Sequence, residues 1–356
     1  MKRTVVSFYK KLHFTGTIIA AVLIMVMFLS LTIIYFTPSI KANMKFSAIL
    51  HLQNGYTVIE LKDNQNGCTA QIYSLGAILN AFSVPTHSGT INVINGFESV
   101  ETAKQTIDLA FQGAKLSPFV CRMRKGEYHL NNRLFKVEKF YLGEHAIHGL
   151  LFDAAYEVLN THADEHNASV GLRYLYKGTD KGYPFSYEIL VNWKLEANNR
   201  LSVRTTVLHH NPQAIPFADG WHPYFNLGDS INHCSLQFDA EQQLEFDSDL
   251  LPTGKAIEDA RFNRPTTIGD IFLDNCFILN QPGKSKCVFQ NNNIRLTIHP
   301  DQHYPYLQVY TPPNRKSIAI ENLSAAPDAF NNKIGLLLLE PNHSYSFTTT
   351  YQLTAL

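Results

Sequence analysis

YEILVNWKL (residues 187–195) and LSVRTTV (residues 201–207) are the two stretches that decide the fold class of this 356-residue chain. Apolar side chains occupy every second position of the first stretch, and the second stretch repeats the alternation. Successive side chains of a strand point to opposite faces of a sheet, so a period of two predicts strands that bury one face. The polar segment 196–199 between them predicts a turn.

The same pattern extends outward along the chain. Residues 294–298 and 345–351 alternate in the same way, and Asn131-Asn132 separates two short apolar stretches as a hairpin turn would. Past Met44, only residues 98–112 carry a clear helical signal. We therefore predict an all-β fold, a large antiparallel β-sandwich that spans residues 46–356.

The composition is that of a folded protein with a large core. Hydrophobic residues make up 45 % of the chain and charged residues only 17 %, which excludes a disordered chain. The 30 basic and 30 acidic residues balance, so no basic surface for nucleic acid is expected. The five basic residues of positions 1–43 have no acidic counterpart there, which leaves the rest of the chain mildly acidic.

The N-terminal part contains a candidate membrane helix. TIIAAVLIMVMFLSLTIIYF (residues 17–36) has no charge and no proline, and twenty helical residues span about 30 Å, the hydrocarbon thickness of a bilayer. Four basic residues precede it, so the positive-inside rule leaves the N-terminus in the cytoplasm and the globular part on the other side. We expect a basic tail (1–16), a membrane helix (17–36), a linker (37–45) and the β-sandwich (46–356).

Two other interpretations of this segment remain open. A cleaved signal peptide normally has a shorter apolar run, of about 7–15 residues, and segment 39–42 fits a cleavage site poorly. Translation that starts at Met44 would instead remove the segment and make the protein cytoplasmic. The expectation is a single-pass anchor with the domain on the non-cytoplasmic side.

The cysteines and histidines predict no metal site. The five cysteines are widely spaced, without a C-x-x-C motif, and burial as small apolar side chains accounts for them. His299 and His303 are four residues apart, but Pro300 disfavours the helix that a zinc pair at this spacing needs. The chain also lacks a glycine-rich phosphate loop and a G-x-S-x-G motif.

Four segments place polar groups among apolar or aromatic residues. They are AIHGLLFD (146–153), GWHPYFNL (220–227), LQVYT (307–311), and IAIEN (318–322) with PDAFN (327–331). Glu321 follows three apolar residues and should be at least half buried, so it is either hydrogen-bonded structurally or retained for chemistry. His222 has a similar structural alternative, packing in an aromatic core beside Trp221.

The order of these motifs resembles that of the aldose 1-epimerase, or galactose mutarotase, family. The motifs extend over nearly the whole predicted sandwich, in the order R…H-G…H-P-Y-F-N-L…D-N-x-F…L-Q-V-Y-T…E…P-D-A-F-N. The His-Pro-Tyr-Phe-Asn-Leu hexapeptide is its most specific part. The resemblance implies a large β-sandwich with an open sugar-binding face, in agreement with the alternating pattern.

The resemblance also implies a set of functional residues. Glu321 corresponds to the catalytic base of the family, and His222 corresponds to its proton donor. The substrate-binding residues that it implies are Arg122, His148, Asp274 and Gln308, to which we add Tyr224 as an aromatic face for the sugar, with Trp221 as the alternative. Three positions depart from the family pattern: Cys121 replaces Asn, Leu150 replaces Gly and Asn322 replaces Pro.

The function implied is that of an isomerase, which interconverts the α and β anomers of a free aldose of the galactose or glucose class. Acid–base ring opening and closure moves no electrons, so no metal or organic cofactor is expected. One alternative is a non-catalytic carbohydrate-binding sandwich at the cell surface. Another is a glycoside hydrolase, which needs paired carboxylates, and only Glu321 and Asp274 are candidates for them.

Overall fold

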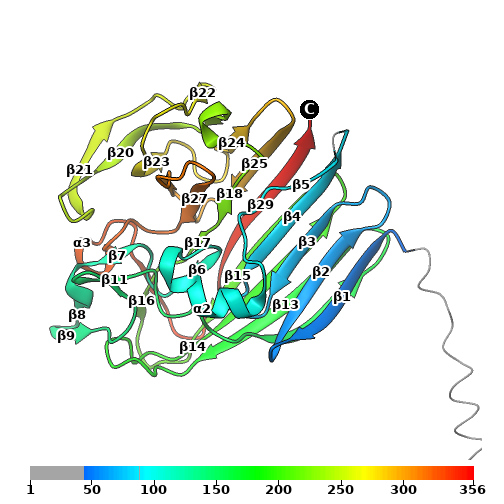
Figure 1. Ribbon diagram of the computed structural model, residues 1–356. Coiled ribbons are helices and arrows are strands. Elements are labelled where there is room, and N and C mark those ends of the chain that lie inside the picture. The colour runs from blue at the N-terminus through cyan, green and yellow to red at the C-terminus, as the bar shows by residue number, and fades with distance from the viewer. Residues whose placement is uncertain (1–43, 88) are drawn as a thin grey trace, which may run out of the picture. The chain divides into compact units, whose positions relative to one another are not determined.

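A computed structural model describes residues 44–87 and 89–356, of which Lys45–Leu356 form one compact unit (Figure 1). The predicted tail and membrane helix lie outside the described residues and stay a prediction. Within the described part, no helix combines the length and the hydropathy needed to cross a bilayer. The first strand, β1, begins at Phe46.

Two large antiparallel sheets pack against each other. One has the order β1-β2-β3-β4-β5, with strands Phe46–Gln53, Tyr56–Asp63, Thr69–Tyr73, Leu79–Thr86 and Gly89–Asn92. The other has the order β12-β13-β14-β15-β29-β25-β24-β19-β22. Its strands in chain order are Glu157–Ala163, Asn167–Tyr176, Tyr187–Glu196, Arg200–Leu208, Ser235–Gln237, Thr266–Thr267, Cys287–Gln290, Ile294–Pro300 and Tyr345–Ala355. Strands β1 and β2 contact β13, which joins the two sheets.

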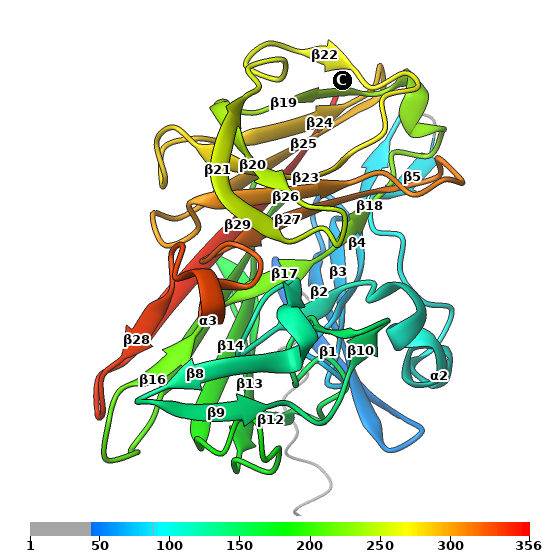
Figure 2. The ribbon, with the colours of Figure 1, turned by 90° about the vertical axis from the view of Figure 1, so that its left-hand side faces the viewer.

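A third sheet, of eight strands, has the order β21-β20-β23-β26-β27-β17-β6, with β18 also paired to β27. Its strands in chain order are Ala114–Leu116, Gly220–His222, Tyr224–Phe225, Ala240–Phe246, Pro252–Glu258, Asp274–Leu279, Tyr306–Tyr310 and Ile318–Leu323. Figure 2 shows β23, β26, β27 and β17 of this sheet side by side, in that order. Small sheets complete the unit: β10-β11-β7 (Tyr141–Leu142, His145–Ile147, Arg122–Met123), β8-β9 (Glu127–Leu130, Arg133–Lys136) and β16-β28 (Ile215–Phe217, Leu337–Leu339).

The strands predicted from alternation are confirmed. Strands β14 and β15 pair as an antiparallel hairpin in which Glu196 is opposite Arg200. The alternate positions of β14 are buried, namely Tyr187, Ile189, Val191, Trp193 and Leu195. The predicted hairpin turn joins β8 to β9, and both of its residues have positive φ, 50° at Asn131 and 60° at Asn132. Asparagine tolerates this conformation, which a two-residue hairpin turn of this type requires.

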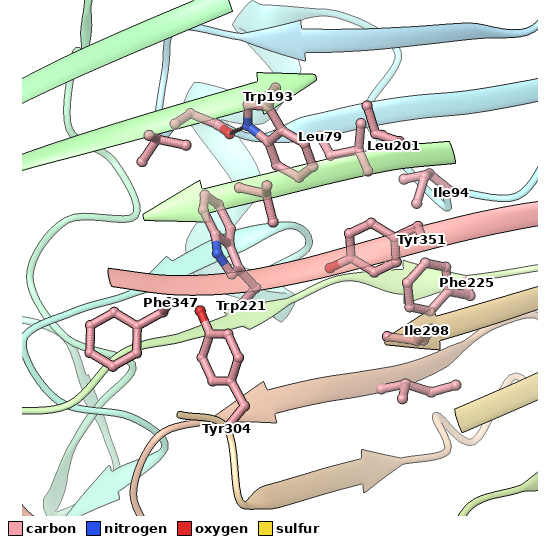
Figure 3. Close-up of a cluster of buried hydrophobic side chains, with 14 of the residues drawn as sticks. Leu79, Ile94, Trp193, Leu201, Trp221, Phe225, Ile298, Tyr304, Phe347 and Tyr351 are labelled. Carbon is pink, nitrogen blue, oxygen red and sulfur yellow. Dashed lines mark hydrogen bonds between the residues drawn. The ribbon is translucent and has the colours of Figure 1, made fainter. Parts of the chain in front are cut away.

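Side chains from all three large sheets meet in one core (Figure 3). Trp193 of β14 packs against Trp221 of β17, with ring centroids 5.5 Å apart. The indole N–H of Trp193 donates a 3.0 Å hydrogen bond to the carbonyl oxygen of Ala77, and Leu79 of β4 lies in the same cluster. Packing of Trp221 in the core therefore fixes the position of β17 at the residue immediately before His222.

The predicted helix at residues 98–112 is confirmed as α2 (Val100–Ala110). The Ser99 side chain caps its start by accepting a hydrogen bond from the Thr102 N–H. The helix ends at Phe111, which has a left-handed φ of 55°. The other helical elements described are α3 (Ala329–Asn332) and the 3₁₀ turns Arg124–Gly126 and Ile231–His233.

Candidate active site

A cavity of about 350 Å³ contains every residue that the sequence analysis named as catalytic or substrate-binding. Its lining includes Arg122, His148, His222, Tyr224, Asp274, Gln308 and Glu321. Glu321 is only 2 % exposed, and the side chains of His148, His222 and Gln308 are buried as well. Residues from distant parts of the chain thus form one buried polar site.

Strand register explains why Gln308, Glu321 and His222 lie in one row. Strands β26 and β27 pair with Gln308 opposite Glu321. Strand β17 pairs with β27 with Gly220 opposite Leu323, and the same antiparallel register sets His222 opposite Glu321 two residues further on. Directly opposite residues on neighbouring strands point to the same face of a sheet. The three side chains therefore project together into the cavity.

A second row lies two residues away on the same strands. Tyr310 of β26 is opposite Asp274 of β23 and Ala319 of β27, and Ala319 is also opposite Tyr224 of β18. The Gln308 amide donates a 2.8 Å hydrogen bond to Oδ1 of Asp274, which links the two rows. The cavity floor therefore offers a carboxylate, an amide and two phenols beside Glu321 and His222.

Strands β7 and β11 bring Arg122 and His148 to the cavity. Arg122 is opposite Ile147, and the His148 N–H donates a 2.9 Å hydrogen bond to the carbonyl oxygen of Cys121. Cys121 (φ 48°) and His148 (φ 60°) both have left-handed backbone conformations. Residues with a Cβ atom adopt this conformation rarely. Strands β7 and β11 therefore meet the cavity beside two residues with rare backbone conformations, Cys121 and His148.

Gly149→Ala is expected to lower the free energy of unfolding by about 2 kcal/mol or more. Gly149 has a φ of +78°, and a Cβ atom there would clash with the carbonyl oxygen of Ser117. Gly143→Ala is the matched control, because Gly143 has a similar φ of +62° but open space around it. Chemical denaturation should give a clearly larger loss for Gly149→Ala, and equal losses would contradict the steric argument.

Glu321 and His222 are in direct contact. Oε1 of Glu321 lies 3.3 Å from Nε2 of His222. Burial raises the pKa of Glu321 well above its ordinary value, and the Asp274 carboxylate raises it further. Burial lowers the pKa of His222 to about 4. Both shifts favour the neutral forms, a carboxylic acid on Glu321 and an uncharged imidazole on His222, and in these forms the pair shares one proton.

His148 and Glu321 each carry a buried atom that is free to bind a ligand. Among the described residues, Nδ1 of His148 and Oε2 of Glu321 have no hydrogen-bond partner. Burial lowers the pKa of His148 well below its ordinary value, and the nearby His222 and Arg122 lower it further, so its imidazole is neutral. Buried polar atoms are normally paired, so these two atoms indicate that a polar molecule completes the site.

Aromatic rings support the two histidines. Tyr224 stacks on His222 with ring centroids 5.0 Å apart, and Phe111 packs against His148 at 4.6 Å. Trp221 points into the core instead, where its ring lies 4.4 Å from the Lys115 ammonium. Of the two aromatic candidates for sugar contact, Tyr224 therefore lines the cavity and Trp221 does not.

Some cavity residues were not predicted as part of the site. Tyr310, Phe111 and Cys121 also line it. Tyr310 could have been found from the sequence, because it is two residues from Gln308 in a strand and so shares its face. Phe111 could not have been found from the sequence. Its position in the cavity depends on a left-handed backbone conformation at the end of α2, where glycine or asparagine is usual.

The fold and the cavity define a class of protein, an acid–base enzyme built on a β-sandwich. A carboxyl–imidazole pair faces a buried polar cavity whose size suits a small polar molecule. The family model for aldose 1-epimerase matches residues 57–352, and the chain belongs to this family. It is therefore an isomerase of the mutarotase type.

The chain is similar to two curated proteins and shares its fold with solved structures. An aldose 1-epimerase from Streptococcus thermophilus is 25 % identical over 330 residues, which cover 82 % of this chain and 92 % of the relative. An uncharacterized protein from Escherichia coli K12 is 27 % identical over 247 residues, which cover 66 % of this chain and 77 % of that protein. The crystal structure of galactose 1-epimerase from Lactobacillus acidophilus superposes with a TM-score of 0.74 at 21 % identity, over 88 % of this chain and 99 % of that one. A galactose mutarotase-like protein from Clostridium acetobutylicum gives a TM-score of 0.75 at 18 % identity, with the same coverage.

Proposed function

We propose that the chain interconverts the α and β anomers of a free aldose of the galactose or glucose class, with Glu321 as the base and His222 as the acid. The observation that carries this proposal is the 3.3 Å contact between the two side chains in the cavity. The hydroxyl oxygen O1 and the ring oxygen O5 of an aldopyranose are bonded to the same carbon atom. An acid and a base that serve these two oxygens must therefore be near neighbours themselves.

In the proposed reaction, Glu321 removes the proton of O1 while His222 donates a proton to O5. The C1–O5 bond breaks and the ring opens to an aldehyde. Rotation about the C1–C2 bond and closure with the two roles reversed then give the other anomer. Burial favours a proton on Glu321 and a neutral His222 at rest, so this proton first passes to His222 across their 3.3 Å contact. Ring opening then ends with a proton on Glu321 again. The proton count of the pair is unchanged, which suits a buried pair that holds one proton.

The other cavity residues are proposed to bind the sugar. Arg122 and the neutral imidazole of His148 would donate hydrogen bonds to sugar oxygens and stabilise negative charge that develops on O5. Asp274 would accept hydrogen bonds from sugar hydroxyl groups, and Gln308 would donate hydrogen bonds to them. These contacts would hold the sugar ring in a fixed position relative to the acid–base pair. Tyr224 would offer its ring to the C–H edge of the sugar. The similarity to the aldose 1-epimerase from Streptococcus thermophilus supports an aldose as the substrate.

Polarimetry of freshly dissolved α-D-galactose and α-D-glucose tests the proposal. A catalytic amount of the chain should accelerate the change in optical rotation well above the rate in buffer. Sugar binding without acceleration would contradict the proposal and favour the carbohydrate-binding alternative. Release of reducing ends from oligosaccharides would favour a hydrolase.

We also propose that residues 17–36 anchor the domain on the non-cytoplasmic side of a membrane. The support is the uncharged apolar sequence and the basic residues before it. Cell fractionation with intact-mass measurement should recover the full-length chain from the membrane fraction. A soluble product that starts at Met44 would contradict the anchor.

A further inference from the structure

Cys121, His148 and Glu321 bring three potential metal-binding atoms together in the cavity. One sulfur, nitrogen or oxygen ligand atom from each lies within 4.8 Å of the other two. All three residues are buried. They reach this point from the segment before β7, the turn after β11 and the middle of β27, so only the folded chain assembles the cluster.

We infer that these three side chains form a binding site for a divalent metal ion of the zinc class, and that the bound ion excludes the sugar. Thiolate sulfur, imidazole nitrogen and carboxylate oxygen are the ligands that zinc uses in proteins. The thiolate disfavours magnesium and calcium, which take oxygen ligands. Three protein ligands leave the fourth tetrahedral position of the ion for water.

The distances fit zinc after small side-chain movements. Ligand atoms on a tetrahedral zinc ion are about 3.3–3.6 Å apart, given metal–ligand bonds of about 2.0–2.3 Å. The present separations of up to 4.8 Å therefore require each atom to approach the ion by roughly an ångström, within reach of side-chain rotation. The binding step replaces the thiol proton, which is released to water, by a metal–sulfur bond.

Two further observations point to a ligand at this cluster. Nδ1 of His148 and Oε2 of Glu321 have no hydrogen-bond partner among the described residues, although both atoms are buried. Cys121 has a φ of 48°, a conformation in which asparagine is common and cysteine is not. A thiol thus occupies a position whose backbone conformation favours another residue, beside two residues that each carry a buried atom without a hydrogen-bond partner.

The same residues explain why the bound ion would inhibit sugar turnover. Glu321 cannot accept the O1 proton while it coordinates a cation, and His148 cannot bind a sugar oxygen with a coordinated nitrogen. This part of the inference rests on the proposed function. The metal site itself does not, because it depends only on the three ligand atoms.

Metal titrations of the full chain test the site directly. Co²⁺, used as a probe for Zn²⁺, should produce a thiolate-to-cobalt charge-transfer absorption, and Zn²⁺ should abolish it at one equivalent per chain. Cys121→Asn should lose the absorption and bind Zn²⁺ at least tenfold more weakly. Cys287→Ser is the matched control, because Cys287 is also buried but does not line the cavity, and it should keep both properties.

Mutarotation assays with added Zn²⁺ test the exclusion of sugar. Zn²⁺ should inhibit the chain in competition with the sugar, a chelator should reverse the inhibition, and Cys121→Asn should need at least tenfold more Zn²⁺ for half-inhibition. Each variant is compared with itself without metal. His148→Asn provides a second ligand variant for the binding measurement if Cys121→Asn does not fold.

The outcomes separate the metal site from the proposed function. Unchanged Zn²⁺ affinity and an unchanged cobalt absorption in Cys121→Asn would overturn the metal site. One bound equivalent of Zn²⁺ that leaves sugar turnover unaffected would overturn the exclusion. A chain that binds Co²⁺ through Cys121 but never accelerates mutarotation would support the site while contradicting the proposed function.

Discussion

Glu321→Gln is expected to lower kcat for mutarotation at least a hundredfold and to leave the fold intact. Glutamine keeps the planar shape and size of the side chain, but its amide cannot take the O1 proton. A positioned general base contributes about 10²–10⁴ in rate, which corresponds to about 3–5 kcal/mol. Glu321 is 2 % exposed, so water has little access to act in its place.

The fold of Glu321→Gln should survive because burial already disfavours the charged form of this side chain. Circular dichroism and denaturation should therefore resemble those of the unaltered chain. Glu340→Gln is the matched control, because it makes the same chemical change at an exposed position outside the cavity. The mutarotation rate of this variant, measured by polarimetry, should equal that of the unaltered chain. A near-normal rate in Glu321→Gln would remove Glu321 from the mechanism.

His222→Ala should have a similar effect, because ring opening needs a proton on O5 as well as removal of the O1 proton. The double variant is the sharper measurement. Groups that act as one unit have non-additive effects, so the double variant should be about as slow as the slower single variant. A double variant whose rate loss equals the product of the two single losses would contradict a concerted acid–base pair.

The sequence predicted the strands well because their signal is local. Each of β14 and β15 buries alternate side chains, and a period of two is visible without knowledge of the partner strand. The cavity residues were predicted for a different reason, the order of motifs shared with the family. Buried glutamate or histidine alone would not have distinguished a structural residue from a functional one.

The register of the eight-stranded sheet could not be predicted. The row of Gln308, Glu321 and His222 depends on which residues of β26, β27 and β17 are opposite one another. No local pattern specifies the pairing of β17 with β27, which lie far apart in the chain, and the loop between the consecutive strands β26 and β27 does not reveal their register. Cys121 illustrates the same limit: its burial was predicted and is confirmed, whereas its proximity to His148 and Glu321 depends on the assembled sheet.

Lys115 and Asp219 are a second feature that the sequence did not predict. The two residues are separated by 104 positions, yet the Lys115 ammonium lies 2.6 Å from both carboxylate oxygens of Asp219, and both side chains are fully buried. The ammonium also donates to the carbonyl oxygen of Gly220, and the Tyr304 hydroxyl donates to Asp219. This network links β6 to the start of β17, the strand that ends at His222.

Asp219→Ala is expected to lower the free energy of unfolding by about 3–5 kcal/mol, because it leaves the Lys115 ammonium buried without a counterion. Burial already lowers the pKa of Lys115 to about 8 in the presence of Asp219, which reflects the cost of keeping this charge away from water. Chemical denaturation of the purified chain measures the loss. Asp153→Ala is the control, because it removes a carboxylate from an exposed ion pair with Lys139 and should cost less than about 1 kcal/mol.

The double variant Lys115→Met, Asp219→Ala should recover a large part of the stability that Asp219→Ala loses. Removal of both charges eliminates the desolvation cost, and Met can fill apolar space beside Trp221. The Tyr304 hydroxyl and the Gly220 carbonyl would still lose their partners, at about 1 kcal/mol each, so recovery should be incomplete. A double variant as unstable as Asp219→Ala would mean that the lost hydrogen bonds, rather than the unpaired charge, dominate. A single-variant loss below about 1 kcal/mol would contradict the buried pair itself.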